Sequence, residues 1–148
     1  MSCALGFDVG SRLTGVAVGN RFTASASALA TLGMRDGEPD WQRLDALRRE
    51  WLPETLVVGL PLDLDGREQP ASRQARRFAT QLRRRYGLPV LLVDERHSSQ
   101  EAAQRFAAAR AAGLRRRADA ASLDAEAAAV ILERWLTGTP ALSTASDG

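Results

Sequence analysis

The fold of this chain is decided by residues 4–20, which read ALGFDVGSRLTGVAVGN. Two Val-containing apolar runs, at 4–9 and 14–19, flank a short turn, and this arrangement is typical of two paired strands. Gly10 and Gly15 allow a tight turn and the close approach of a backbone or a phosphate. Asp8 is the one carboxylate inside the first run. Strand interiors disfavour Asp, so a charge there requires a partner.

Three interpretations of Asp8 are open from this stretch alone. The side chain can cap its own turn, as Asp commonly does. It can hold a metal ion, together with the phosphates that a metal brings. It can also belong to the phosphate-binding turn of kinase-like and actin-like ATPases, which reads Asp-x-Gly-(Ser/Thr) between two strands. That class needs two such lobes, and 148 residues with one turn leave no room for the second.

The length and composition predict one domain with its own core. We expect this domain to span residues 1–137, and residues 138–148 to form a flexible tail, because the end of the chain is small and polar. Cys3 is the only cysteine, which excludes an internal disulfide and fits a reducing compartment. No apolar run is long enough to cross a bilayer, and Asp8 interrupts the first one, so we expect neither a membrane partner nor a secretion signal. These features favour a cytoplasmic protein.

The rest of the chain alternates strand and helix patterns. Amphipathic spacing predicts helices, and short continuous apolar runs predict buried strands. The expected elements are a third strand at 22–32, a loop at 34–40, a helix at 41–51, a strand at 55–59, a helix at 69–86, a strand at 90–93, a helix at 98–112, a loop at 114–121 and a helix at 122–136. A meander followed by βαβα units predicts an α/β fold. Its mixed five-stranded sheet has the order 3-2-1-4-5 and helices on both faces.

Positive charge is concentrated in one part of the chain. The net charge is only +2, and every basic residue is Arg, yet residues 67–117 hold 13 Arg and 4 acidic residues. Arg binds phosphate through two parallel hydrogen bonds, so this excess indicates a polyanion such as nucleic acid, although a solvated helix face is the simpler alternative. The candidate nucleic-acid-binding residues are Arg12, Arg67, Arg76, Arg96, Arg115, Arg116 and Arg117.

Three carboxylates stand apart from the surface charges. Asp8 lies in a central strand, Glu95 follows the strand at 90–93, and Asp124 lies on the apolar face of the last helix with Ile131. Ligands collect at the carboxyl ends of strands in such sheets. Three carboxylates meeting there need cations, and Mg²⁺ and Mn²⁺ prefer oxygen ligands. Asp8, Glu95 and Asp124 are therefore the candidate catalytic and metal-binding residues. Two ions between them would support phosphodiester hydrolysis.

An ordered set of motifs resembles the YqgF/RuvX family of pre-16S rRNA nucleases, also called Holliday-junction resolvase-like proteins. The motifs are Gly6-Phe7-Asp8-Val9-Gly10-Ser11, Gly15-Val16-Ala17-Val18, Val57-Val58-Gly59-Leu60-Pro61-Leu62, Asp65-Gly66, Val93-Asp94-Glu95-Arg96 and Leu123-Asp124-Ala125. The resemblance covers residues 4–136. It implies a ribonuclease H-like fold and a metal-dependent nuclease that acts in ribosome biogenesis, on the 5′ end of pre-16S rRNA and in contact with ribosomal precursor particles. Asp8, Glu95 and Asp124 match the family's acidic positions.

The chain departs from the family pattern at two positions. Alternatives also stay open for the role of His97, the substrate, the function and the oligomeric state. Asp63 stands where Asn is usual, and His97 where an apolar or aromatic residue is usual. His97 can assist proton transfer or be an ordinary surface residue. Branched DNA is the alternative substrate, and a non-catalytic nucleic-acid-binding regulator is the alternative function. The protein can act as a monomer, or as a homodimer if it makes paired cuts in a branched duplex.

Overall fold

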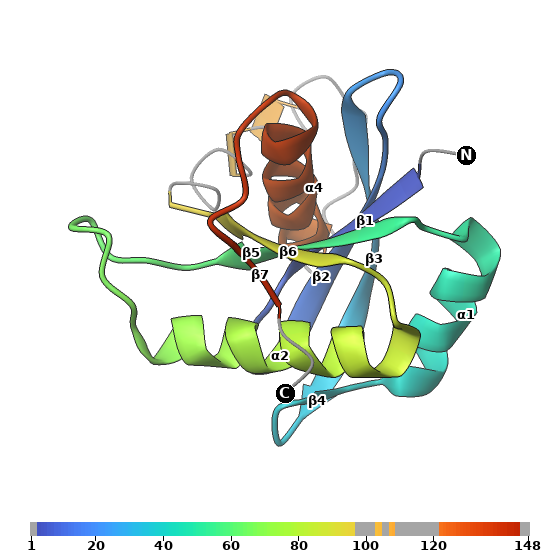
Figure 1. Cartoon of the computed structure of the whole chain (residues 1–148), viewed down its shortest axis with the longest axis horizontal. Helices are drawn as coiled ribbons and strands as arrows, with labels where there is room; N and C mark the ends of the chain where they lie inside the picture. Colours follow the sequence, from blue (N-terminus) through green and yellow to red (C-terminus); the bar gives the residue numbers. More distant parts are fainter. Residues whose placement is uncertain (1–2, 97–102, 105–106, 109–121, 146–148) are drawn as a thin grey trace.

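A seven-stranded mixed sheet separates helix α4 on one face from helices α1 and α2 on the other (Figure 1). The computed structural model describes residues 3–96, 103–104, 107–108 and 122–145. The strands are β1 (Cys3–Asp8), β2 (Leu13–Asn20), β3 (Ser25–Arg35), β4 (Glu38–Pro39), β5 (Thr55–Leu60), β6 (Val90–Asp94) and β7 (Ser143–Thr144). The helices are α1 (Trp41–Trp51), α2 (Pro70–Tyr86) and α4 (Ser122–Leu136).

The strand order is β4-β3-β2-β1-β5-β6-β7, so β1 is the central strand. β1 pairs antiparallel with β2 and parallel with β5, and β5 pairs parallel with β6. The five inner strands have the predicted order, which confirms the α/β fold class. They follow it because each helical crossover returns the chain beside the preceding parallel strand.

The sheet has two more strands than the five predicted, and both are short strands at its edges. β4 lies in the segment expected to be a loop at 34–40 and pairs with the end of β3. β7 lies within the expected tail at 138–148 and pairs antiparallel with Leu91 and Leu92 of β6. Each added strand has two residues, which is too short for alternation to be visible in the sequence. Hydrogen bonds to a neighbouring edge define them.

The helix ends follow local signals in the sequence. Asp40 caps α1 by accepting a hydrogen bond from the backbone N–H of Arg43, at 3.2 Å. Leu52 ends α1 in the left-handed conformation, at φ 48°, and Pro53 follows. Gly87 ends α2 at φ 66°, where a residue with a side chain would be strained. These caps confirm the predicted helices at 41–51 and 69–86.

One face of the sheet carries large apolar side chains. Successive residues of a strand point to opposite faces, so Leu5 and Phe7 of β1 share the face covered by α1 and α2. The ring of Phe7 packs edge-on against Phe78 of α2, with 5.3 Å between centroids. Leu44 is the fully buried residue of α1 in the same cluster. This face holds the larger part of the hydrophobic core.

The opposite face is lined by small residues and is covered by α4. Ala4 and Gly6 point toward it from β1, and Ala17 points toward it from β2. A Cβ on Gly6 would lie 2.7 Å from Cβ of Leu132, which is closer than real contacts allow. Because α4 is itself rich in Ala, its backbone lies very close to the sheet. The alternation that turns Ala4 and Gly6 toward α4 also turns Asp8 toward it.

Several expected features lie outside the described residues. These are most of the helix expected at 98–112, the loop expected at 114–121, and the side chain of His97. Residues 103–104 and 107–108 have helical backbone. Among the helices that the structure does describe, none has the length and apolarity needed to cross a membrane.

Candidate active site

Asp8 is the last residue of the central strand, and Gly15 of β2 lies opposite it in the antiparallel register. A Cβ on Gly15 would overlap the backbone carbonyl of Asp124 and would lie 2.6 Å from the backbone nitrogen of Ala125. The missing side chain of Gly15 therefore lets the first turn of α4 approach the end of β1. This approach brings Asp124 toward Asp8.

Glu95 follows β6 and points to the same face. Its backbone N–H donates to the carbonyl of Leu60, at 3.2 Å, which extends the pairing of β5 with β6 by one residue. Its side chain packs over Gly59, where a Cβ would lie 3.1 Å from Cδ of Glu95. Only 9% of Glu95 is exposed. The carboxyl group thus reaches across β5 toward β1 through a gap that Gly59 leaves.

The three carboxylates interact electrostatically. Burial raises the pKa of Asp8 to about 6, a hydrogen bond with the side chain of Glu95 opposes this rise, and the charge of Asp124 adds to it. Burial also raises the pKa of Asp124. Two carboxyl groups in hydrogen-bond contact share a proton unless a cation replaces it. The structure therefore brings Asp8 and Glu95 into contact and places Asp124 within electrostatic range of Asp8.

This donor set is chemically suited to a hard divalent cation. The carboxyl groups of Asp8 and Glu95 are in contact, and the unfavourable charge on the buried Asp8 is the kind that a cation would relieve. Within the described part of the chain, however, no three Asp, Glu, His or Cys side chains are already grouped closely enough to ligate one ion. The contact is closest between Asp8 and Glu95, and Asp124 lies within electrostatic range of Asp8.

The turn after Asp8 is held from two sides by residues that sequence reasoning missed. The backbone N–H of Gly10 donates to Oγ1 of the fully buried Thr14, at 3.5 Å. Nε2 of Gln74, on α2, donates to the carbonyl of Gly10 at 3.2 Å. No pattern in the sequence indicates a contact between residues 64 positions apart. Gly10 itself lets the turn close, since a Cβ there would overlap the carbonyl of Leu13.

The candidate arginines separate into three groups. Arg12, Arg67 and Arg96 lie in the connections that follow β1, β5 and β6, at the same end of the sheet as Asp8 and Glu95. Arg76 lies on α2, on the opposite face. The residues at 115–117 lie outside the described part of the chain. The structure therefore places three of the seven predicted arginines at the same end of the sheet as the carboxylates.

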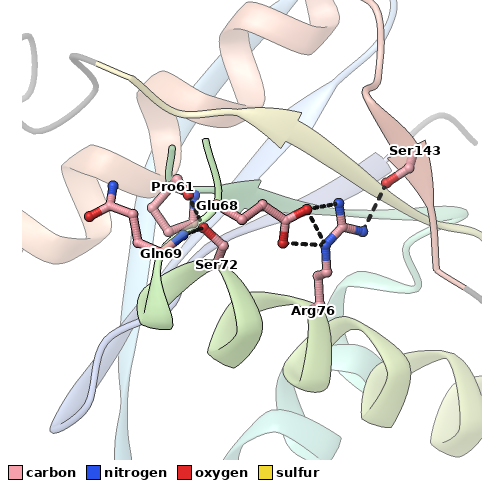
Figure 2. A network of polar contacts seen from close by, with 6 residues as sticks. All are labelled: Pro61, Glu68, Gln69, Ser72, Arg76 and Ser143. Carbon is pink, nitrogen blue, oxygen red and sulfur yellow. Dashed lines mark hydrogen bonds and ion pairs between the residues drawn. The ribbon is translucent and has the colours of Figure 1, made fainter. Parts of the chain in front are cut away.

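Arg76 is engaged in a contact that differs from the predicted role. Its guanidinium makes a two-pronged ion pair with Glu68, with 2.7 Å between Nη2 and Oε2, and Nη1 lies 3.4 Å from Oγ of Ser143 (Figure 2). It thus links the loop after β5 to β7. Beside it, Ser72 donates to the carbonyl of Pro61 and accepts from the backbone N–H of Gln69, at 2.8 Å, which holds the same loop on α2 (Figure 2).

Asp63 organises the tip of this loop. Oδ1 of Asp63 accepts hydrogen bonds from the backbone N–H groups of Asp65 and Arg67, at 2.9 and 2.8 Å. The backbone N–H of Gly66, at φ 82°, donates to the carbonyl of Asp63. These are the contacts of an Asx turn, which Asn would also make. The acidic residue at this position therefore has a local structural partner.

The protein is similar in sequence to the RuvX family and in fold to RuvC. The family model described as "RuvX: Holliday junction resolvase" matches residues 2–138. Proteins named "Putative pre-16S rRNA nuclease" from Xylella fastidiosa (strain M12) and Xanthomonas oryzae pv. oryzae (strain PXO99A) are 61% and 60% identical over 132 residues. The aligned region is 89% of this chain and 85% of each relative.

The structural comparison agrees with this relationship. RuvC of T. thermophilus, solved in complex with a Holliday junction substrate, superposes with a TM-score of 0.53 over 95% of this chain and 98% of that chain, at 18% identity. A second structure of Thermus thermophilus RuvC gives a TM-score of 0.51. At this level of identity the likeness supports the ribonuclease H-like fold alone. Taken with the match over residues 2–138, it leads to one conclusion: the chain belongs to the RuvX family.

Proposed function

We propose that this protein is a divalent-metal-dependent endonuclease that hydrolyses phosphodiester bonds in structured precursor rRNA, at the 5′ end of pre-16S rRNA. The observation that carries this proposal is the contact between the carboxyl groups of Asp8 and Glu95, with Asp124 within electrostatic range. The relatives named as pre-16S rRNA nucleases support the substrate. Ribosomal precursor particles are then the partners, and the cytoplasm is the compartment.

The proposed chemistry assigns separate tasks to the residues. Asp8, Glu95 and Asp124 would hold Mg²⁺ or Mn²⁺, which when bound supplies an activated water and stabilises the leaving oxygen. Gly15 and Gly59 keep the space between the three carboxylates narrow. Gln74 and Thr14 fix the turn after Asp8, so its carboxylate stays oriented. Arg12, Arg67 and Arg96 extend from the same end of the sheet and would contact the phosphates of the substrate.

The experiment compares the wild type with Asp8→Asn on a pre-16S rRNA fragment, in Mg²⁺, in Mn²⁺ and in a chelator. We expect cleavage by the wild type with either metal and none in the chelator. Because several kcal/mol of catalysis depend on the ligated metal, Asp8→Asn should lower the rate by about 100-fold or more. Asp36→Asn is the matched control, since Asp36 is exposed in the turn between β3 and β4. Equal cleavage by Asp8→Asn and wild type would refute the metal site.

Resolution of branched DNA is the second candidate function. It is favoured by the family description, and by the likeness in fold to a RuvC bound to a Holliday junction. A four-way DNA junction, tested beside the RNA under the same conditions, separates the two substrates. Paired symmetric cuts would also require a homodimer. If neither substrate is cut in either metal, the alternative of a non-catalytic nucleic-acid-binding regulator on this fold is favoured.

A further inference from the structure

An open cavity of about 380 Å³ lies at the end of β6, at the edge of the sheet. Its described lining consists of Leu64, Asp94, Arg96, Arg134 and Thr139. The lining comes from the loop after β5, the end of β6, α4 and the connection from α4 to β7. Among the described residues, β7 pairs with Leu91 and Leu92, and no described strand covers the end of β6.

Two guanidinium groups meet in this cavity. Nη1 of Arg134 donates to the backbone carbonyl of Arg96, at 2.9 Å, which joins the side chain from α4 to the end of β6. Nε and Nη2 of Arg96 contact Oδ2 of Asp94, at 2.8 and 2.6 Å. Nη1 of Arg96 lies toward the Gly66 turn, 3.7 Å from the position of a Cβ on Gly66. Both cations are thus held in place, and the lining carries one net positive charge.

The remaining lining residues suit a nucleotide. Thr139 brings a hydroxyl group, and its backbone N–H donates to the carbonyl of Arg134 at 2.8 Å, so its position is tied to that of the arginine. Leu64 is 82% exposed and offers an apolar surface to a sugar or a base. Guanidinium forks match the geometry of phosphate oxygens. The combination fits a phosphate with its attached nucleoside better than an isolated anion.

The position of the cavity connects it to the reaction. Arg96 and Asp94 are the two neighbours of Glu95 in the chain, on either side of the carboxylate that contacts Asp8. A strand whose scissile phosphate lies at the carboxylates would therefore pass beside the cavity. We propose that Arg134, Arg96 and Thr139 form a subsite for a backbone phosphate flanking the scissile one. This inference rests on the proposed nuclease function for its place along the strand.

The test measures binding without cleavage. Asp8→Asn provides a full-length background, and the probe is a fluorescently labelled RNA hairpin with a single-stranded flank, titrated at several salt concentrations. In this background Arg134→Gln should weaken binding about fivefold to tenfold and reduce the slope of log K against log salt by about 0.7–0.9, the loss of one phosphate contact. Arg134→Lys keeps the charge and should keep the slope.

Matched variants separate this subsite from a purely structural role. The hydrogen bond from Arg134 to the carbonyl of Arg96 involves no phosphate. A purely structural brace therefore predicts an unchanged slope in Arg134→Gln, and that result would overturn the inference. Arg43→Gln is the control, because Arg43 is exposed on α1, on the opposite face of the sheet. It should leave the slope unchanged.

A second measurement locates the phosphate. Single methylphosphonate groups, which remove one charge, are placed along the flank of the probe. At the phosphate held by the subsite, the substitution should weaken binding of the Arg134 protein but add nothing to the Arg134→Gln defect. If the effects of methylphosphonate and of Arg134→Gln on binding add at every position of the flank, the contact between Arg134 and a phosphate is refuted. Because the readout is binding, a reduced slope in Arg134→Gln would retain the subsite even if the wild-type protein cut neither RNA nor DNA in either metal, a result that would count against the nuclease proposal alone.

Discussion

The backbone of Asp124 lies where a side chain on Gly15 would stand. Gly15 is also the cross-strand partner of Asp8, so one missing side chain sets the separation of two candidate metal ligands. Similar contacts occur along the face beneath α4, where Gly6 lies under Leu132 and Gly59 under Ile131. The position of the helix therefore depends on glycines of the sheet that leave room for its backbone at Asp124 and for its side chains at Leu132 and Ile131.

Replacement of Gly15 by Ala should displace the first turn of α4. The added Cβ meets backbone atoms, which cannot rotate away, and we expect a loss of about 3 kcal/mol in the free energy of unfolding. The cleavage rate should fall by a larger factor than the fraction of folded protein does. Urea denaturation and rates measured at a fixed folded concentration check this. Gly33→Ala is the control on β3, where no atom lies within 4 Å of the new Cβ. If both variants have wild-type stability, α4 does not pack as described.

Replacement of Gln74 by Met should impair cleavage without unfolding the protein. Met keeps the length of the side chain but cannot donate to the carbonyl of Gly10, so the turn after Asp8 loses its contact with α2. We expect cleavage to fall about tenfold or more, and the Mn²⁺ concentration for half-maximal activity to rise. Gln81→Met is the control, since Gln81 donates to Glu38 at the other end of α2. An equal effect of both substitutions would argue for general loosening of the helix.

Arg76 should contribute less to nucleic-acid binding than Arg67. Arg76 lies on α2, on the face of the sheet opposite α4 (Figure 1), and both prongs of its guanidinium contact Glu68. Both side chains are more than 40% exposed, so Arg76→Gln should cost at most about 1 kcal/mol of stability. In salt titrations of RNA binding, Arg67→Gln should reduce the slope of log K against log salt, and Arg76→Gln should not. A reduced slope in Arg76→Gln would restore the role expected from the sequence.

Acid should weaken the contact between α1 and α2. Hydrogen bonds from Arg85 and Tyr86 hold the pKa of Asp45 well below its ordinary value of 3.8. Because the folded pKa is the lower one, this carboxylate stabilises the fold above about pH 4, and its contribution disappears as the pH falls below that value. Asp45→Asn should therefore be less stable than the wild type at neutral pH, with a difference that narrows in acid.

The check is urea denaturation between pH 7 and pH 2. Asp36→Asn is again the control, because Asp36 lies in an exposed turn. A difference between Asp45→Asn and wild type that stays constant over this range would contradict the assignment. The direction follows from the ion pair, whose 2.7 Å distance joins Nη2 of Arg85 to Oδ2 of Asp45.

Local sequence signals were sufficient to predict the central fold. The apolar runs gave five strands, and Asp40 and Gly87 marked helix ends, because each depends on neighbours in the chain. β4 and β7 were missed because each is defined by its pairing with a longer neighbouring strand, β3 for β4 and β6 for β7. Propensity over two residues cannot reveal such pairing.

The candidate site was predictable to the extent that it depends on strand ends. Asp8 and Glu95 could be placed together because the carboxyl ends of β1 and β6 lie at the same end of the sheet. Gln74 and Arg134 could not be found, since each acts through a backbone carbonyl that is distant in sequence. The roles of His97 and of the arginines at 115–117 stay predictions.

The close packing of α4 on the sheet has a consequence for heat inactivation. The side covered by α4 buries mainly small residues of the sheet, yet residues 127–132 of the helix are all buried. Elements that bury their apolar surface so completely open only with the core, so α4 is expected to leave the sheet in the global unfolding transition. Asp124 would then stay near Asp8 until the fold is lost. Catalytic competence would disappear at the same temperature as the secondary structure.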